Sequence, residues 1–340
     1  MSFHHRLSRM RCVWVALLIL TAPLAAGADD DTPVVVVDGH LHTFEEVLQL
    51  MDQYVSDDSI VAFVFGSFVS PAVGEVLGAE VYRDSTGVLV DPVISDSSQL
   101  LLDEADGAFA AGDYDTALAL YRVIQRLEPA YPHILTLIGD SYRVLKMYDS
   151  ATYYLQTAID ANPLDFKAWW YLADTFYALD YTVEALDLLT RAHVLNPCHQ
   201  DLKQHIVNRR GDFGRGWDDW SFVPQIQMSE DERGQRLRVG LEWMCYGAVK
   251  MLWTYGDGYR EKMAGDSDDP VSLRILEEKE ALLAHMVDEQ PDERLMRIVD
   301  DGRVVEFILY EILMMEDPKI VRLLTEESLE RITEYVDTYH

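Results

Sequence analysis

The chain has 340 residues, 49% of them apolar, which is enough for two or three domains with substantial cores. Its formal charge at pH 7 is −31 and its pI is near 4.5. Nucleic-acid phosphates would be repelled at long range, so a nucleic-acid partner is excluded, whereas basic partners or divalent cations would be attracted. A surface rich in acids and poor in lysine also serves solubility.

Residues 1–28 have the pattern of a signal peptide. Arg6, Arg9 and Arg11 precede an apolar run over residues 13–20, which is too short to span a bilayer comfortably. The run leads to Ala-Gly-Ala at residues 26–28, a small-x-small cleavage pattern. We therefore expect an exported protein, periplasmic or secreted, with no stable membrane span after cleavage.

Two cysteines, Cys198 and Cys245, lie beyond this segment. In an oxidising compartment they could form one disulfide, and two separate buried thiols fit the sequence equally well.

Residues 29–97 indicate a small α+β region or a partly ordered leader. The β-branched run 34–37 precedes a hairpin-type Asp-Gly turn, and further strands are expected within 60–69 and at 88–90. Thr43 and Glu46 form a capping box that predicts a helix to about residue 54.

A period of 34 residues organises the next stretch. Pro129, Pro163 and Pro197 are spaced by this period, and the same spacing separates three alanines (Ala117, Ala151, Ala185) and three aspartates (Asp106, Asp140, Asp174). Such a period is typical of a helical repeat array. We expect three helix–turn–helix repeats within 98–210, with Ser97 or Ser98 capping the first helix and residues 201–210 forming a capping helix over the last repeat.

This pattern resembles the tetratricopeptide repeat (TPR) family, whose first helix carries Trp-x2-Leu-Gly-x2-Tyr and whose second carries Ala-x3-Phe and then Pro. The third repeat matches with Trp169, Leu172, Ala173, Phe176, Ala185, Leu189, Ala192 and Pro197. The second matches with Leu135, Ile138, Gly139, Tyr142, Ala151, Leu155, Ala158 and Pro163. The first repeat is degenerate in its first helix. The resemblance implies a mainly α fold: a three-repeat TPR solenoid, followed by a helical C-terminal domain and preceded by the small α+β region.

The rest of the chain is expected to be an irregular connector, 211–228, and a helical domain, 229–340. The aromatic cluster of residues 217–222 is interpreted as a packed part of the connector or as an aromatic ligand patch. Ser229 and Glu232 form a capping box that predicts a helix to about residue 255. Further helix starts are indicated at Asp269-Pro270, Pro291, Asp317-Pro318 and Thr325, and the apolar run 304–315 should be buried.

No catalytic constellation is recognisable. The His40-Leu41-His42 triplet is similar to the first metal-binding motif of metal-dependent amidohydrolases, but the next histidine is His133 and the repeats occupy the space that such a barrel would need. The acidic loops at 256–258 and 265–269 lack the ligand spacing of an EF-hand. We therefore predict a non-enzymatic protein without cofactor or metal.

In TPR proteins the first helix of each repeat lines a concave groove that holds an extended peptide. Projected onto this chain, that resemblance predicts a groove lined by Asp106, Phe109, His133, Thr136, Asp140, Arg143, Lys167, Trp170, Asp174 and Tyr177. Aspartate stands where the carboxylate-clamping members carry a recurring asparagine. An acidic row flanked by aromatic rings suits a protein or peptide partner of basic or amide-rich character. Equally, these aspartates could bridge neighbouring helices.

Two alternatives remain open at this point. A catalytic or small-ligand site could lie in the C-terminal helical domain, with Arg303, Glu306 and Glu311 as lining residues and the repeats as an accessory. The repeats could also associate with a second copy of the chain.

Overall fold

A computed structural model of the chain contains two compact units, each assembled from two separate stretches of sequence. The mixed unit combines Met1–Pro71 with Phe222–Leu309, and the repeat unit combines Ala72–Ser221 with Tyr310–His340. These units cut across the expected ranges 29–97 and 229–340. The structure describes residues 34–37, 40–43, 62–64, 81–83, 89–90, 92–218, 220–231, 234–240, 243–256, 258–265, 267–288 and 292–340. The expected signal peptide and the helix expected over residues 44–54 lie outside these ranges.

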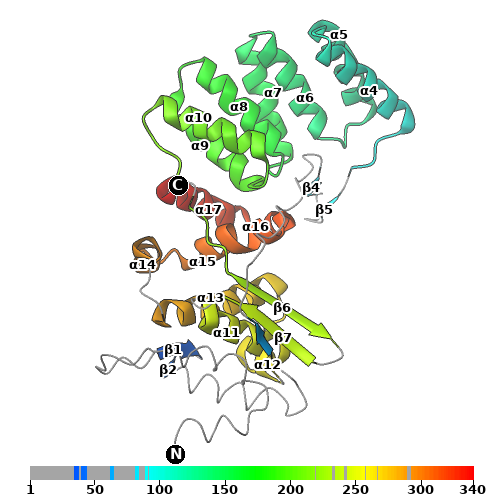
Figure 1. Ribbon diagram of the computed structural model, residues 1–340. Coiled ribbons are helices and arrows are strands. Elements are labelled where there is room, and N and C mark those ends of the chain that lie inside the picture. The colour runs from blue at the N-terminus through cyan, green and yellow to red at the C-terminus, as the bar shows by residue number, and fades with distance from the viewer. Residues whose placement is uncertain are drawn as a thin grey trace, which may run out of the picture. The chain divides into compact units, whose positions relative to one another are not determined.

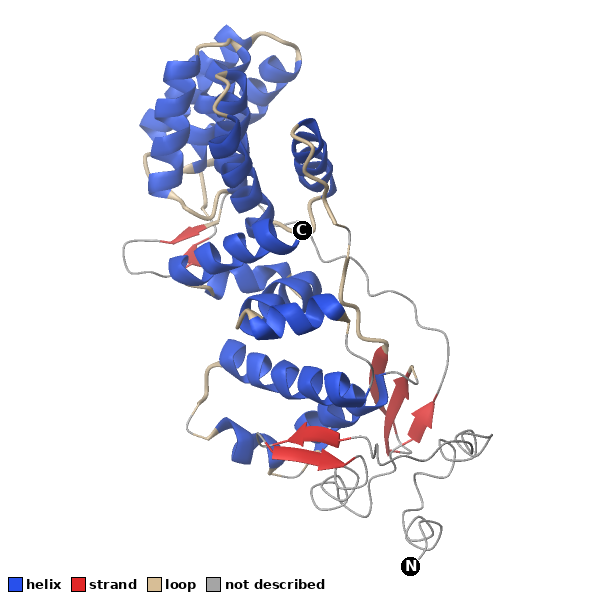
Figure 2. Ribbon diagram, turned by 90° about the vertical axis from the view of Figure 1, so that its left-hand side faces the viewer, coloured by secondary structure: helices blue, strands red, loops and turns tan. Residues whose placement is uncertain are grey.

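The repeat unit contains three consecutive helix pairs and one further helix, as the 34-residue period predicts (Figure 1). The pairs are α4 (Asp96–Ala110) with α5 (Tyr114–Leu127), α6 (His133–Val144) with α7 (Tyr148–Ala161), and α8 (Phe166–Ala178) with α9 (Thr182–Leu195); α10 (Gln200–Asp212) comes next. Helices predominate among the described residues (Figure 2). The prediction of a mainly α chain with TPR-like helix pairs is confirmed.

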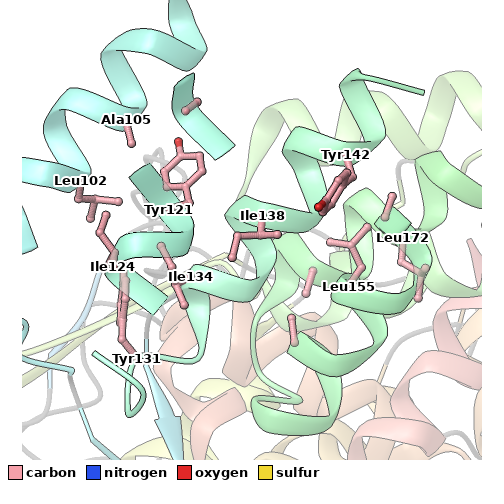
Figure 3. Close-up of a cluster of buried hydrophobic side chains, with 14 of the residues drawn as sticks. Leu102, Ala105, Tyr121, Ile124, Tyr131, Ile134, Ile138, Tyr142, Leu155 and Leu172 are labelled. Atoms are coloured by element: carbon pink, nitrogen blue, oxygen red, sulfur yellow. The ribbon is translucent and has the colours of Figure 1, made fainter. Parts of the chain in front are cut away.

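Small residues allow the two helices of a pair to approach each other closely. A Cβ atom on Gly139 of α6 would lie 2.6 Å from Cγ of Leu155 on α7. Ala117, Ala151 and Ala185, the alanines of the repeat period, are all buried. Larger apolar side chains fill the remaining space in a cluster that runs from α4 to α8, as Figure 3 shows for Leu102, Tyr121, Ile138, Leu155 and Leu172.

The first helix of the array begins earlier than expected. Its cap is Ser95, which has extended backbone angles and whose hydroxyl accepts the backbone N–H of Ser98 at 3.3 Å. Ser98, one of the two expected caps, is buried, and its hydroxyl donates to Glu128 at 2.7 Å. Glu128 also accepts from the hydroxyl of Ser95 at 2.7 Å, so this carboxylate holds the start of α4 against the end of α5.

The stretch Tyr310–His340 returns to pack against the repeats. It holds α16 (Met314–Glu316), the 3-10 helix η3 (Pro318–Leu323) and α17 (Glu326–Tyr339), and α17 contacts α9. The expected helix starts at Asp317-Pro318 and Thr325 are confirmed, because each of the two residues Asp317 and Thr325 accepts a backbone N–H as a cap. A short antiparallel pair, β4 (Tyr82–Arg83) with β5 (Leu89–Val90), also belongs to this unit.

The sheet of the mixed unit differs from the structure expected from the sequence. The end of the expected connector and the start of the helix expected behind Ser229 instead form the antiparallel strands β6 (Ile226–Asp231) and β7 (Gly234–Val239). Leu237 and Val239 of β7 are both buried, and their spacing of two residues puts them on the same face of a strand. β3 (Ala62–Val64) pairs parallel with β7, giving the order β3-β7-β6, and β1 (Val34–Val37) forms a separate hairpin with β2 (His40–Thr43).

Five helices complete the described part of the mixed unit, namely α11 (Met244–Tyr255), α12 (Tyr259–Ala264), α13 (Pro270–Asp288), α14 (Glu293–Asp300) and α15 (Val304–Phe307). The helix start expected at Pro270 is confirmed. A π-helix, η2 (Ile308–Leu313), continues α15. Of the run 304–315 that was expected to be buried, residues 306–314 are buried, whereas Val305 is 38% exposed. Cys198 and Cys245 are both buried thiols outside any disulfide.

Candidate functional site

The three aspartates of the repeat period occupy equivalent positions on α4, α6 and α8, but each is bound within the protein. Asp106 accepts the hydroxyl of Tyr121 at 2.6 Å. Asp140 is only 7% exposed and accepts Nε of Arg143 at 2.8 Å. Asp174 lies 2.7 Å from Nε2 of His205 on α10. Asp106 and Asp174 therefore bridge neighbouring helices, whereas the hydrogen bond of Asp140 stays within α6.

Two arginines extend these contacts into a network that joins α6, α8 and α10. Arg143 Nη1 lies 3.9 Å from Asp174 Oδ2, and Arg209 Nη2 lies 4.0 Å from Asp174 Oδ1. The guanidinium of Arg143 stands 5.3 Å from the ring centre of Tyr171, and that of Arg209 stands 3.8 Å from Tyr177. The face is thus balanced in charge, not acidic as the aspartate row suggested.

Burial shapes the electrostatics of this network. Loss of hydration raises the pKa of Asp140, although the Arg143 guanidinium opposes that shift. For Arg143, burial acts to lower the pKa, and the charge and hydrogen bond of Asp140 raise it overall. Tyr171 also has a raised pKa, because burial and the nearby Asp140 charge disfavour the phenolate.

Two of the expected groove residues lie in the interior. His133 is 3% exposed, and Thr136 is fully buried beside it. His133 Nδ1 lies 2.6 Å from Asp165 Oδ2, and the Thr136 hydroxyl donates to the same oxygen at 2.7 Å. The other oxygen of Asp165 caps α8 by accepting the backbone N–H groups of residues 167 and 168. The expected placement of His133 and Thr136 on an exposed groove wall is therefore wrong. Both side chains instead bind Asp165 at the junction between the second and third repeats.

The remaining expected residues are partly exposed. Lys167 is half-buried on α8, and its ammonium forms no hydrogen bond or ion pair with the described residues. The Trp170 ring packs 5.5 Å from that of His205, Tyr177 donates its hydroxyl to Asp212 at 3.1 Å, and Phe109 packs edge-on against Tyr114 at 5.1 Å. We define the polar face as Asp106, Phe109, Asp140, Arg143, Lys167, Trp170, Asp174, Tyr177, His205 and Arg209.

Two residues of this face, His205 and Arg209, were not predicted from the sequence. They are four residues apart on α10, so both lie on one side of that helix. The capping helix was expected from its apolar residues, and its polar side was left without a role. The i, i+4 spacing of these two basic residues was the sequence signal from which their place in the site could have been predicted.

The three residues of the alternative site have partners of their own. Arg303 Nη1 lies 3.9 Å from Glu306 Oε1 in the mixed unit, and Glu311 belongs to the repeat unit. There Glu311 accepts the Tyr335 hydroxyl at 3.1 Å and lies 2.6 Å from His340 Nε2.

The aromatic cluster of the connector packs against the protein. Trp217 lies 5.2 Å from the ring of His193, and Phe222 packs 5.1 Å from Trp243. Both contacts fit the packed-connector interpretation. Among the described residues, no three His, Cys, Asp or Glu side chains are placed to share a metal ion. Within the same residues no helix combines the length and the apolar character needed to cross a membrane.

No protein-family model matches the chain, and no curated protein does. Among solved structures, the first TPR of Spaghetti (RPAP3) bound to an HSP90 peptide is 22% identical, covers 36% of this chain and 97% of its own, and has a TM-score of 0.33. The Yersinia enterocolitica type III secretion chaperone SycD with a YopD peptide is 16% identical over 36% of this chain and 95% of its own, with a TM-score of 0.33. MamA is 15% identical over 71% of this chain and 97% of its own, with a TM-score of 0.31. The TPR-like character of the repeats rests on the helices and contacts described above.

Proposed function

We propose that the chain is a non-enzymatic scaffold that binds a partner protein or peptide on its polar face. The observation that carries the proposal is the network of Arg143, Asp174 and Arg209, which fixes charged and aromatic side chains across three helices. A rigid face lowers the entropy lost when a partner is ordered on it. Two of the solved structures named above hold peptides. The proposal for this chain is supported by its own residues.

The proposal differs from a simple acidic groove. Because Asp140 and Asp174 are already paired with cations, their charges offer little to a partner. Lys167, Phe109 and the exposed parts of Trp170 and Tyr177 remain for direct contact, while the formal charge of −31 favours the approach of a basic partner at long range. Exchanging Asp140 or Asp174 for lysine would disrupt the network and so would not test binding alone.

Site-specific crosslinking provides the test. A photoreactive residue in place of Lys167 should crosslink to a polypeptide partner, whereas one in place of Gln156, an exposed residue of α7, should not. Lys167→Glu should weaken capture of the same partner, and Lys146→Glu, an equal charge change in an exposed turn, should leave it intact. Equal crosslinking from both positions, or equal loss in both variants, would count against the polar face.

We propose in addition that the protein is exported after cleavage behind Ala28. The charged, apolar and small-residue segments of residues 1–28 support this. The intact mass of the protein recovered outside the cytoplasm should correspond to a chain that begins at Asp29. Recovery of the full-length chain from the cytoplasm alone would overturn the proposal.

A further inference from the structure

The mixed unit contains a cleft between the end of α11, the turn after it, α12 and α13. Its volume is about 560 Å³, and its lining includes Trp253, Arg260, Glu261, Arg274 and Glu277. Clefts that hold small molecules usually measure about 300–1,000 Å³. The size therefore suits a small ligand, and the lining determines its chemistry.

A buried ionic cluster lies directly behind one wall. Lys250 is 8% exposed, and its ammonium lies 2.6 Å from Oε1 of Glu278, which is 1% exposed. The same ammonium contacts Glu277, and the hydroxyl of Tyr246 donates to Glu278. Glu277 thus belongs both to the cluster and to the cleft lining.

Burying the Lys250–Glu278 ion pair lowers the stability gained from packing α11 against α13. Moving an ion into the interior costs several kcal/mol, and apolar residues of similar volume would hold α11 to α13 at least as well. Burial raises the pKa of Glu277, against the effect of the Lys250 charge. Shifted ionisable groups beside a cavity are a common feature of binding sites.

The charges of the cleft are of both signs. The ammonium of Lys250 faces the two carboxylates of Glu277 and Glu278, and the positive charge of Arg274 also acts on Glu277. Arg260 and Glu261 on α12 are both exposed, and neither side chain forms an ion pair with the described residues. Arg274, which lies on α13 with Glu277, adds a second guanidinium.

We propose that this cleft binds a small zwitterion, a molecule of the size of an amino acid or short peptide that carries both an amine and a carboxylate. Glu277 receives the ammonium, and Arg260 with Arg274 receives the carboxylate. Trp253 supplies an apolar wall, and its ring is held in place because the indole N–H donates to Glu280 at 2.7 Å. This inference is independent of the polar face, which lies in the other unit.

Calorimetric titration of the whole protein with four probes tests the proposal. L-alanyl-L-alanine should bind, whereas putrescine, succinate and glucose, which are a cation, an anion and a neutral polyol, should bind at least tenfold more weakly. Glu277→Gln and Arg260→Ala should each weaken dipeptide binding about tenfold, or about 1.4 kcal/mol. Arg297→Ala, an exposed change on α14 of the same unit, should have no effect.

Several outcomes would overturn the proposal. Equal or tighter binding of putrescine, succinate or glucose would show that the cleft does not select zwitterions. If titration with the dipeptide at millimolar concentration released no heat of binding, the cleft would not be a zwitterion site. The same conclusion would follow if Arg260→Ala left the dipeptide affinity unchanged. Arg260 is exposed, so its variant should fold normally even where Glu277→Gln disturbs the buried cluster, and thermal melting checks both.

Discussion

Three equivalent turn residues have the same left-handed backbone conformation although their side chains differ. Gly112, Lys146 and Asp180 stand 34 residues apart in the turns within the helix pairs, with φ of 82°, 60° and 64°. A side chain in this left-handed region costs about 1–2 kcal/mol, and glycine avoids that cost. The side chains of Lys146 and Asp180 are exposed and make no hydrogen bond or ion pair with the described residues, so their replacement removes no contact of this kind.

Lys146→Gly and Asp180→Gly should therefore each stabilise the protein by up to about 1 kcal/mol, while the added freedom of glycine in the unfolded chain limits the gain. Gly112→Ala should destabilise it by about 1 kcal/mol, because alanine enters the strained region. Urea midpoints of the three variants measure these changes. Loss of stability in both glycine variants would show that the strain is relieved elsewhere.

Asp165 combines two roles whose loss should add up. Asp165→Ala removes the cap of α8 and leaves His133 and Thr136 buried without their acceptor, so we expect a loss of roughly 2–4 kcal/mol. Asp165→Asn keeps an oxygen for the cap and should cost less. Asp160→Ala, on the exposed side of α7, provides the matched control and should change the unfolding free energy by less than about 0.5 kcal/mol. Similar losses for residues 160 and 165, measured by urea unfolding, would contradict this assignment.

At the scale of elements, the spacing of α6 and α7 depends on one glycine. Gly139→Ala places a methyl group 2.6 Å from Cγ of Leu155, so the helix must move, at about 1–3 kcal/mol less the gain in helix propensity. Combining it with Leu155→Ala, which by itself creates a cavity, should cost less than the two changes separately. Chemical unfolding of the four proteins of this double-mutant cycle gives the coupling, and strict additivity would exclude the contact as its source.

Elements with a repeated pattern were predictable, and those that depend on distant partners were not. The period carried by the prolines located α4 to α9 and placed the aspartates in register. By contrast, the capping box at Ser229 fits a helix in isolation, while β7 exists because it pairs with β6 and with residues 62–64. The partners of the aspartates were equally hidden, because His205 and Arg209 belong to a helix outside the period.

At the scale of the chain, each unit joins stretches that are far apart in sequence. The period could not reveal that Tyr310–His340 packs on α9, because an apolar helix face does not specify its neighbour. The contact is partly polar. Arg191 pairs with Glu326 at 2.5 Å, and His193 Nε2 lies 2.8 Å from the Tyr310 hydroxyl. Both ends of this second contact are buried, so the join between the two stretches of the repeat unit should respond to pH.

The expected pH dependence of stability arises from the buried imidazole of His193. Burial lowers the pKa of His193 to about 3, with smaller contributions from the charges of Lys203, His340 and Arg210. The unfolded chain takes up a proton on this histidine near pH 6.5, whereas the folded protein does so only near pH 3. The contribution of neutral His193 is therefore complete above pH 6.5 and is lost as the pH falls, at up to about 1.4 kcal/mol per pH unit.

Urea unfolding at pH 7, 6 and 5 should show this slope before most carboxylates titrate, and His193→Gln should flatten it. Tyr310→Phe is the matched variant, because it removes the hydrogen bond but leaves the imidazole buried. It should lower the unfolding free energy by about 1 kcal/mol at every pH and keep the slope. If His193→Gln retains the full slope, or if Tyr310→Phe abolishes it, desolvation of His193 is not the cause of the acid sensitivity of the repeat unit.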